Sequence, residues 1–156
     1  MIVTLGPPQS LDYYDSQSVT LVRPVAPLDA WNIIMASPQP VLRAAFAVRD
    51  AISARFGVKR ICGFTGARVG QVAVGDYLDF FLVEDTTPEH LVLTERDRHL
   101  DVMTCVSCEG PVLTITSSVI THNWFGRAYM LPVGVAHKVI VRGMLDRLAR
   151  AVAASG

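Results

Sequence analysis

The end of the chain repeats apolar residues at the spacing of an α-helix. They follow one another at steps of three, four, four, four and four: Val133, Ala136, Ile140, Met144, Leu148 and Val152. This spacing places them on one side of a helix. Pro132 suits the first helical position, where its missing N–H is not needed. The sequence therefore predicts a helix over 132–154 with an apolar face, and such a face must pack against a large apolar partner.

The segment before this helix has the alternating pattern of β-strands. Turn-forming residues divide it into four runs: Tyr77–Glu84, His90–Glu95, His99–Ser107 and Val112–His122. Short connections between strands favour antiparallel pairing. An antiparallel meander is thus the expected partner of the C-terminal helix.

The first half of the chain is less regular. Residues 1–16 read as an extended arm, and Ser18–Val22 as a short strand. One helix is expected from Pro27 to Met35, ended by Ser37 and Pro38, and a second helix after Pro40. The second helix has an apolar stripe and a glycine as C-cap, formed by Val41, Ala45, Val48, Ile52, Phe56 and Gly57. Five glycines between 57 and 75 predict a loop region with one strand over 68–74.

This order of elements predicts an α+β fold of the helix-grip (START-like) type, in which a curved antiparallel sheet wraps around a long C-terminal helix. We expect one domain over 1–156. The stretches Asp97–Asp101 and Thr121–Tyr129, the latter running into Pro132, resemble hallmark segments of a bacterial domain family of unknown function. That family is grouped with the START-like and polyketide-cyclase-like (SRPBCC) superfamily, and the resemblance covers residues 12–150. It implies a cavity between sheet and helix, and almost no chemistry.

The composition excludes some classes of partner. Hydrophobic residues make up 51% of the 156 residues, and 14 basic residues balance 14 acidic ones. A chain of this kind is not disordered, and it lacks the uncompensated positive charge that nucleic acid binding needs. The high mean hydropathy of +0.36 indicates apolar surface that lines a cavity or is covered in a homodimer.

The sequence also bears on location and cofactors. The longest run without charged residues, Gly110–Gly126, contains too many polar residues for a membrane span. The first basic residue is Arg23, unlike in a secretion signal, and an odd number of cysteines fits a reducing compartment, so the expected location is cytoplasmic. Cys105 and Cys108 lie three apart in a strand, which is too distant for a disulfide. No metal site, Gly-rich phosphate loop or other cofactor motif is predicted.

His99 and Asp101 are one candidate catalytic pair. Residues two apart on a strand share a face, and a carboxylate beside an imidazole orients a general base. The other face, with Leu100 and Val102, is more apolar and is the expected core face. The pair would then point away from the cavity, so a structural ion pair is the favoured interpretation.

Polar and aromatic residues also gather where the last strand leads into the helix. His122, Asn123 and Arg127 are expected at the mouth of a cavity, with Tyr129 and Trp124 beside them. A helix N-terminus and an arginine can together hold a carboxylate or phosphate. The alternative is that Arg127 pairs with an acidic neighbour and that His122 and Asn123 cap the turn. His122 is also a candidate acid or base.

Three functions follow from this sequence. The favoured one is binding of an apolar or amphipathic small molecule in a cavity, with Arg127, Tyr129, Asn123 and Trp124 as ligand-binding residues. The second is a cyclase- or hydrolase-like enzyme that uses His99, Asp101 or His122 for acid–base catalysis. The third is a dimeric interaction protein. No feature of the sequence specifies the ligand or a reaction.

Overall fold

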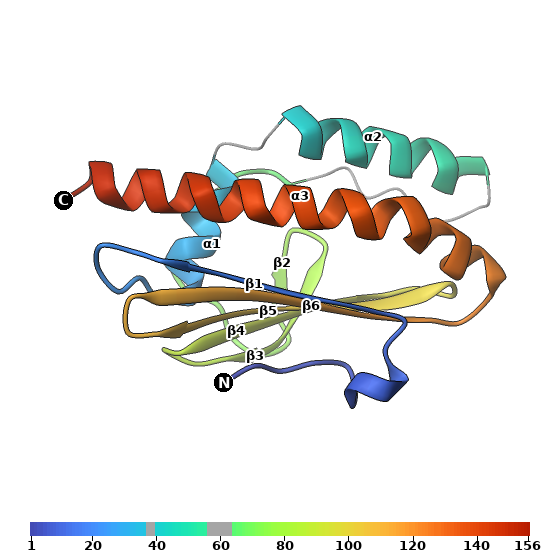
Figure 1. Cartoon of the computed structure of the whole chain (residues 1–156), viewed down its shortest axis with the longest axis horizontal. Helices are drawn as coiled ribbons and strands as arrows, with labels where there is room; N and C mark the ends of the chain where they lie inside the picture. The colour runs from blue at the N-terminus through green and yellow to red at the C-terminus, as the bar shows by residue number, and fades with distance from the viewer. Residues whose placement is uncertain (37–39, 56–63) are drawn as a thin grey trace.

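One antiparallel sheet and one long helix make up most of the molecule. The computed structural model describes residues 1–36, 40–55 and 64–156, and in the second helix it leaves the side chains at 41, 45, 46, 48, 52 and 53 undescribed (Figure 1). The elements are η1 Pro8–Ser10, β1 Tyr13–Thr20, α1 Pro27–Ala36, α2 Pro40–Arg55, β2 Tyr77–Leu78, β3 Phe81–Thr86, β4 His90–Arg96, β5 Leu100–Glu109, β6 Val112–Thr121 and α3 Trp124–Ala154. The predicted α+β helix-grip fold is confirmed.

The six strands lie in the order β1-β6-β5-β4-β3-β2, with every neighbouring pair antiparallel. Strands β3 to β6 form the predicted meander. β1 comes from the N-terminal part of the chain and pairs along β6, with Tyr13 opposite Val119 and Thr20 opposite Val112. Helix α3 runs along one face of this curved sheet, and α1 and α2 lie on the same side (Figure 1).

The predicted strand at 18–22 was placed too late. β1 begins at Tyr13 and ends at Thr20. The run from Asp15 to Ser18 in this strand is polar, and Ser16 and Ser18 face outward, where their hydroxyls bond to Thr116 and Thr114 of β6. This segment forms a strand because it pairs with β6 and its hydroxyls bond across the pair, although it lacks the apolar pattern that a strand usually shows.

The arm is correspondingly shorter than predicted. It crosses the outer face of the sheet, where Val3 and Leu5 pack on Val92, Met103 and Cys105.

Two further strand predictions were wrong. The run Tyr77–Glu84 is broken between β2 and β3, because Asp79 turns the chain with a left-handed φ of 56°. No strand is present over 68–74, where Asn32 of α1 instead bonds both the N–H and the carbonyl of Val69. The first two helices begin as predicted at Pro27 and Pro40, whereas the predicted stripe of α2 and its C-cap Gly57 lie outside the described residues.

Helix α3 begins at Trp124, well before the predicted start at Pro132. The side chain of Asn123 caps it by accepting a hydrogen bond from the N–H of Gly126. Pro132 lies inside the helix, on its exposed side, where a proline removes one helical hydrogen bond and bends the axis. The first turns of α3 bend toward the end of β6 at this place (Figure 1).

The core lies between the inner face of the sheet and the C-terminal half of α3. Ile140, Met144, Leu148 and Val152 are buried there, as the helical spacing predicts. They pack in one cluster with inward residues of the strands, which include Leu91, Leu93, Val106, Leu113 and Ile115. The N-terminal half departs from the predicted stripe, because Ala136 is exposed and Gly134 and His137 face the sheet instead.

This packing predicts the effect of a charge in the apolar stripe. Ile140→Asp should lower the free energy of unfolding by at least about 3 kcal/mol, because it buries a carboxylate without a partner. Val139→Asp is the matched control, since Val139 is 65% exposed on the adjacent position, and it should change stability by less than about 1 kcal/mol. Urea unfolding of both variants measures this. Equal losses would show that the helix faces are assigned wrongly.

Candidate functional site

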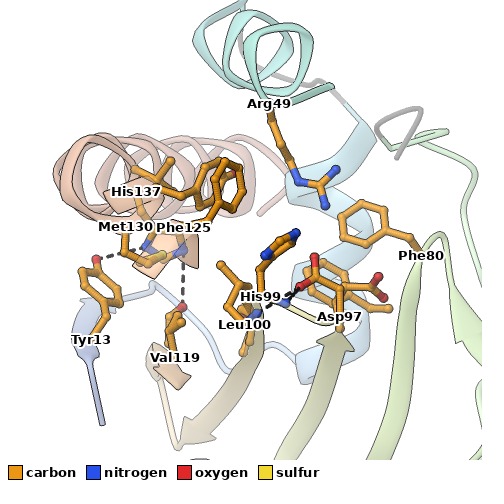
Figure 2. A pocket seen from close by; sticks show the side chains of 17 residues that line it. Tyr13, Arg49, Phe80, Asp97, His99, Leu100, Val119, Phe125, Met130 and His137 are labelled. Carbon is orange, nitrogen blue, oxygen red and sulfur yellow. Dashed lines mark hydrogen bonds between the residues drawn. The ribbon is translucent and has the colours of Figure 1, made fainter. Parts of the chain in front are cut away.

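A cavity of about 200 Å³ lies beneath the N-terminal half of α3 (Figure 2). Its walls are mostly apolar and come from the sheet, from α3 and from the turn before β3. They include Phe80, Leu100, Val102, Val119, Phe125 and Met130. The bend at Pro132 and the departure of α3 from its apolar stripe fall in this same region, so the helix here covers a space instead of a packed core.

A second cavity of about 140 Å³ continues beneath the middle of α3. It reaches α1, with Trp31, Ile34 and Met35 in its wall. The two cavities share four lining residues, which are Phe81, Thr104, Ser117 and His137. Together they reach the lower end of the volumes that small-molecule sites have in proteins.

The shared wall carries a short chain of polar groups. The hydroxyl of Tyr13 lies 3.1 Å from the carbonyl oxygen of Gly134 and 3.4 Å from Nδ1 of His137. Nε2 of His137 lies 3.4 Å from Oγ of Ser117. Gly134 makes this approach possible, because a Cβ there would lie 2.9 Å from the ring of Tyr13.

Burial determines the protonation states of His137 and Tyr13. It lowers the pKa of His137 below its usual value of 6.5, against a smaller opposing effect of the Asp15 carboxylate. It also raises the pKa of Tyr13 to about 12, with Asp15 acting in the same direction. Both side chains are therefore neutral at pH 7.

The outer rim of the cavity is polar. The side chain of Arg49, only 19% exposed, points from α2 toward His99 and Asp97 (Figure 2). Arg49 lies 3.3 Å from the carboxylate of Asp50, and its guanidinium acts to lower the pKa of the Tyr129 hydroxyl. Burial raises the pKa of Tyr129 in spite of this neighbour. Arg49 is the one arginine or lysine that lines the cavity within the described part of the chain.

His99 and Asp101 do not share a face, contrary to the expectation. The carboxylate of Asp97 accepts hydrogen bonds from the N–H groups of His99 and Leu100, at 2.6 and 2.9 Å. This Asx-type turn places His99 before the strand, which begins at Leu100. The ring of His99 packs on Phe125 with centroids 4.6 Å apart and lines the cavity.

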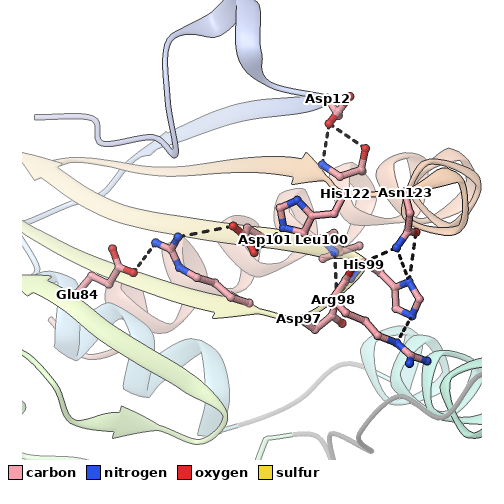
Figure 3. A network of polar contacts seen from close by, with 11 residues as sticks. Asp12, Glu84, Asp97, Arg98, His99, Leu100, Asp101, His122 and Asn123 are labelled. Carbon is pink, nitrogen blue, oxygen red and sulfur yellow. Dashed lines mark hydrogen bonds and ion pairs between the residues drawn. The ribbon is translucent and has the colours of Figure 1, made fainter.

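Asp101 lies on the opposite, outer face of the sheet. Its carboxylate is 3.0 Å from Nε2 of His122 and 3.6 Å from Arg96, which also bonds Glu84 (Figure 3). Leu100, Val102 and Thr104 line the cavity and Val106 joins the core, which confirms the predicted core face. The structure therefore separates Asp101 and His122 from the cavity by the sheet itself.

The residues predicted at the junction into α3 do not all lie at the cavity. Asn123 caps the helix and also lies 3.2 Å from Nδ1 of His99 (Figure 3). Arg127 is exposed and Trp124 is 73% exposed. Hydrogen bonds from Thr121 are the main cause of the lowered pKa of Asp12, and the charge of Arg127 adds a smaller effect in the same direction. Tyr129 alone of this group lines the cavity. Gly126 is required here, since any side chain would collide with the carbonyl of His99.

Tyr13, Arg49, Ser117 and His137 are among the polar residues of the cavity that the sequence analysis missed. His137 stands beside the apolar stripe of the helix, and a lone histidine at such a position is the one signal that the sequence offers. The other three lie on β1, α2 and β6, which are distant in the chain, and the pairing of β1 with β6 brings Tyr13 and Ser117 to the same region.

Cys105 and Cys108 are free thiols, and burial raises the pKa of both. The described residues contain no cluster of His, Cys, Asp and Glu suited to a metal ion, and none of their helices could cross a membrane. An exposed apolar stripe runs along α3 and consists of Trp124, Leu131, Val135 and Val139. A homodimer stays a prediction, and this stripe is the surface to test for it.

The lowered pKa of His137 predicts a pH dependence of stability. Below pH 6.5 the unfolded chain binds a proton at this residue before the folded chain does, so the free energy of unfolding falls with decreasing pH. His137→Gln should show a smaller decrease between pH 7.5 and 5.5 in urea unfolding. An equal decrease in both proteins would show that His137 is not buried in the neutral form.

The comparisons with known proteins give a family and no function. No curated protein and no solved structure matches the chain. One family model, described as a protein of unknown function (DUF2867), matches residues 8–144. This range includes β1, the whole sheet and most of α3, and therefore every residue of the cavity. The chain belongs to this family of proteins of unknown function.

Proposed function

We propose that the protein binds a small amphipathic molecule in the two adjoining cavities beneath α3. The main support is their four shared lining residues, which place two apolar spaces of about 200 and 140 Å³ next to each other. Cavities of this size lower the stability of the folded protein. If the sequence were selected only for stability, we would expect side chains to fill these spaces.

The distribution of polar groups suggests how the ligand lies. We call the cavity beneath the N-terminal half of α3 the outer cavity and the one beneath the middle of α3 the inner cavity. The inner cavity has walls of Trp31, Ile34, Leu42 and Met144, which suit an aliphatic or aromatic body. Burial of apolar area contributes about 25 cal/mol of binding free energy per Å² and is the main source of affinity in such a site. The rim has Arg49, whose guanidinium suits a carboxylate or another acceptor at the end of the molecule.

Arg49 replaces Arg127 in this proposal. Arg127 is exposed on the outside of α3, and the N–H of Gly126 at the helix start is already bonded to Asn123. Of the predicted ligand-binding residues, only Tyr129 stays in the proposed site. Acid–base catalysis by Asp101 and His122 is not part of the proposal, because both lie on the other face of the sheet.

The fold supports a further assignment. We infer from the helix-grip arrangement and the cavity beneath its helix that the family belongs with the START-like superfamily. A cytoplasmic location is proposed with it, on the basis of the free thiols of Cys105 and Cys108.

Filling the outer cavity tests the site. Val133→Trp places a large side chain from α3 into it and should weaken binding of decanoate at least about tenfold, because the ligand loses its space. Val135→Trp is the control on the exposed side of the same helix and should leave the affinity unchanged. Titration calorimetry on folded samples decides this. Equal affinities in both variants would place the decanoate site elsewhere.

The role of Arg49 is tested with an acid and its alcohol. Arg49→Ala should weaken binding of decanoate by about 1.5 to 3 kcal/mol, the range for a hydrogen bond to a charged group, and that of decan-1-ol much less. Arg43→Ala removes an exposed arginine from the same helix and serves as the control. If acid and alcohol lose affinity equally, Arg49 supports the fold and does not bind the head group.

A further inference from the structure

The polar chain Tyr13–His137–Ser117 lies in the middle of an apolar site. Ser117 is 2% exposed, and its inward neighbours along β6 are Ile115 and Val119. A valine at this position would pack equally well with those neighbours, and a buried hydroxyl lowers stability unless it is well bonded. Its hydroxyl lies 3.4 Å from Nε2 of His137, near the outer limit for a hydrogen bond.

The direction of the hydrogen bonds follows from their partners. The carbonyl of Gly134 can only accept, so the hydroxyl of Tyr13 donates to it. The phenol oxygen is then free to accept the hydrogen of Nδ1 of His137. A neutral histidine has one N–H, so Nε2 carries a lone pair and faces Ser117 between the two cavities.

We propose that His137 and Ser117 bind a hydroxyl group in the body of the ligand, which makes the ligand an alcohol or phenol on an apolar frame. The inference rests on the proposed cavity function. The ligand hydroxyl donates to Nε2 of His137 and accepts from Oγ of Ser117. Because these two atoms are 3.4 Å apart, one oxygen can lie about 2.8 Å from both, an ordinary hydrogen-bond distance.

The charges around His137 favour a hydroxyl over a carboxylate at this position. The lone pair of Nε2 would repel a carboxylate oxygen, and Asp15 on β1 adds a negative charge close to His137. Tyr13, the other titratable group in contact, has its pKa raised to about 12 by burial and is neutral at pH 7. Asp97, Glu95 and His99 face the outer cavity at its rim together with Arg49, where the head group of the ligand is placed.

Two probes of the same shape test the proposal: 2-naphthol and 2-methylnaphthalene. They differ only in a hydroxyl against a methyl group, and each is titrated into the full chain by fluorescence. His137→Leu and Ser117→Ala should raise the Kd for 2-naphthol by about three- to tenfold, the effect of one neutral hydrogen bond. The Kd for 2-methylnaphthalene should not rise.

Two further variants complete the test. Ser16→Ala removes a hydroxyl from the outer face of the same sheet and should leave both affinities unchanged. His137→Gln retains a carbonyl acceptor and should restore part of the 2-naphthol affinity that His137→Leu loses. A merely structural role of His137 would alter both probes equally.

The outcomes separate the two proposals. If 2-methylnaphthalene binds the wild type and both probes respond equally to His137→Leu and Ser117→Ala, hydroxyl recognition is wrong and the cavity function stands. If neither probe binds the wild type, the cavity function fails and the hydroxyl site fails with it. A loss confined to 2-naphthol in both variants supports the proposal.

Discussion

Helix α3 packs against the inner face of the sheet, and this contact forms both the core and the cavities. The two halves of α3 pack differently. The C-terminal half presents a continuous apolar stripe around Leu145 and Leu148 and forms the core. The N-terminal half contains Pro132, Gly134 and His137, and the sheet beneath it carries Ser117 and Thr104. One helix thus provides both the stability of the domain and the cover of a cavity.

Much of the fold could be predicted from the sequence because two periods are clear in it. Helical spacing around Ile140 and alternation along Leu100 to Val106 predicted the long helix, the meander and the face by which they meet. The errors arose where tertiary contacts override local pattern. Tyr13 starts a strand because β6 supplies a partner, and Asn123 starts a helix well before the residue expected from proline preference alone.

The site was harder to predict than the fold. Its polar residues Tyr13, Arg49, Ser117 and His137 come from four elements, and only the pairing of β1 with β6 beneath α3 brings three of them together. By contrast, the sequence analysis grouped residues that are close along the chain, such as His99 with Asp101. At the start of β5, Asp101 lies on the outer face of the sheet whereas His99 lies at the cavity. The reason is the turn before the strand, which the carboxylate of Asp97 stabilises.

Under the proposed function a ligand enters the space beneath α3 and does not bind the exposed stripe on the outer side of this helix. An NMR titration with 2-methylnaphthalene, followed by methyl chemical shifts, distinguishes these two sites. We expect shifts at Val102, Val119 and Val133, which line the cavity, and none at Val135 and Val139 on the exposed side. Shifts confined to Val135 and Val139 would contradict the proposed function, and would identify the outer face of the helix as the binding surface.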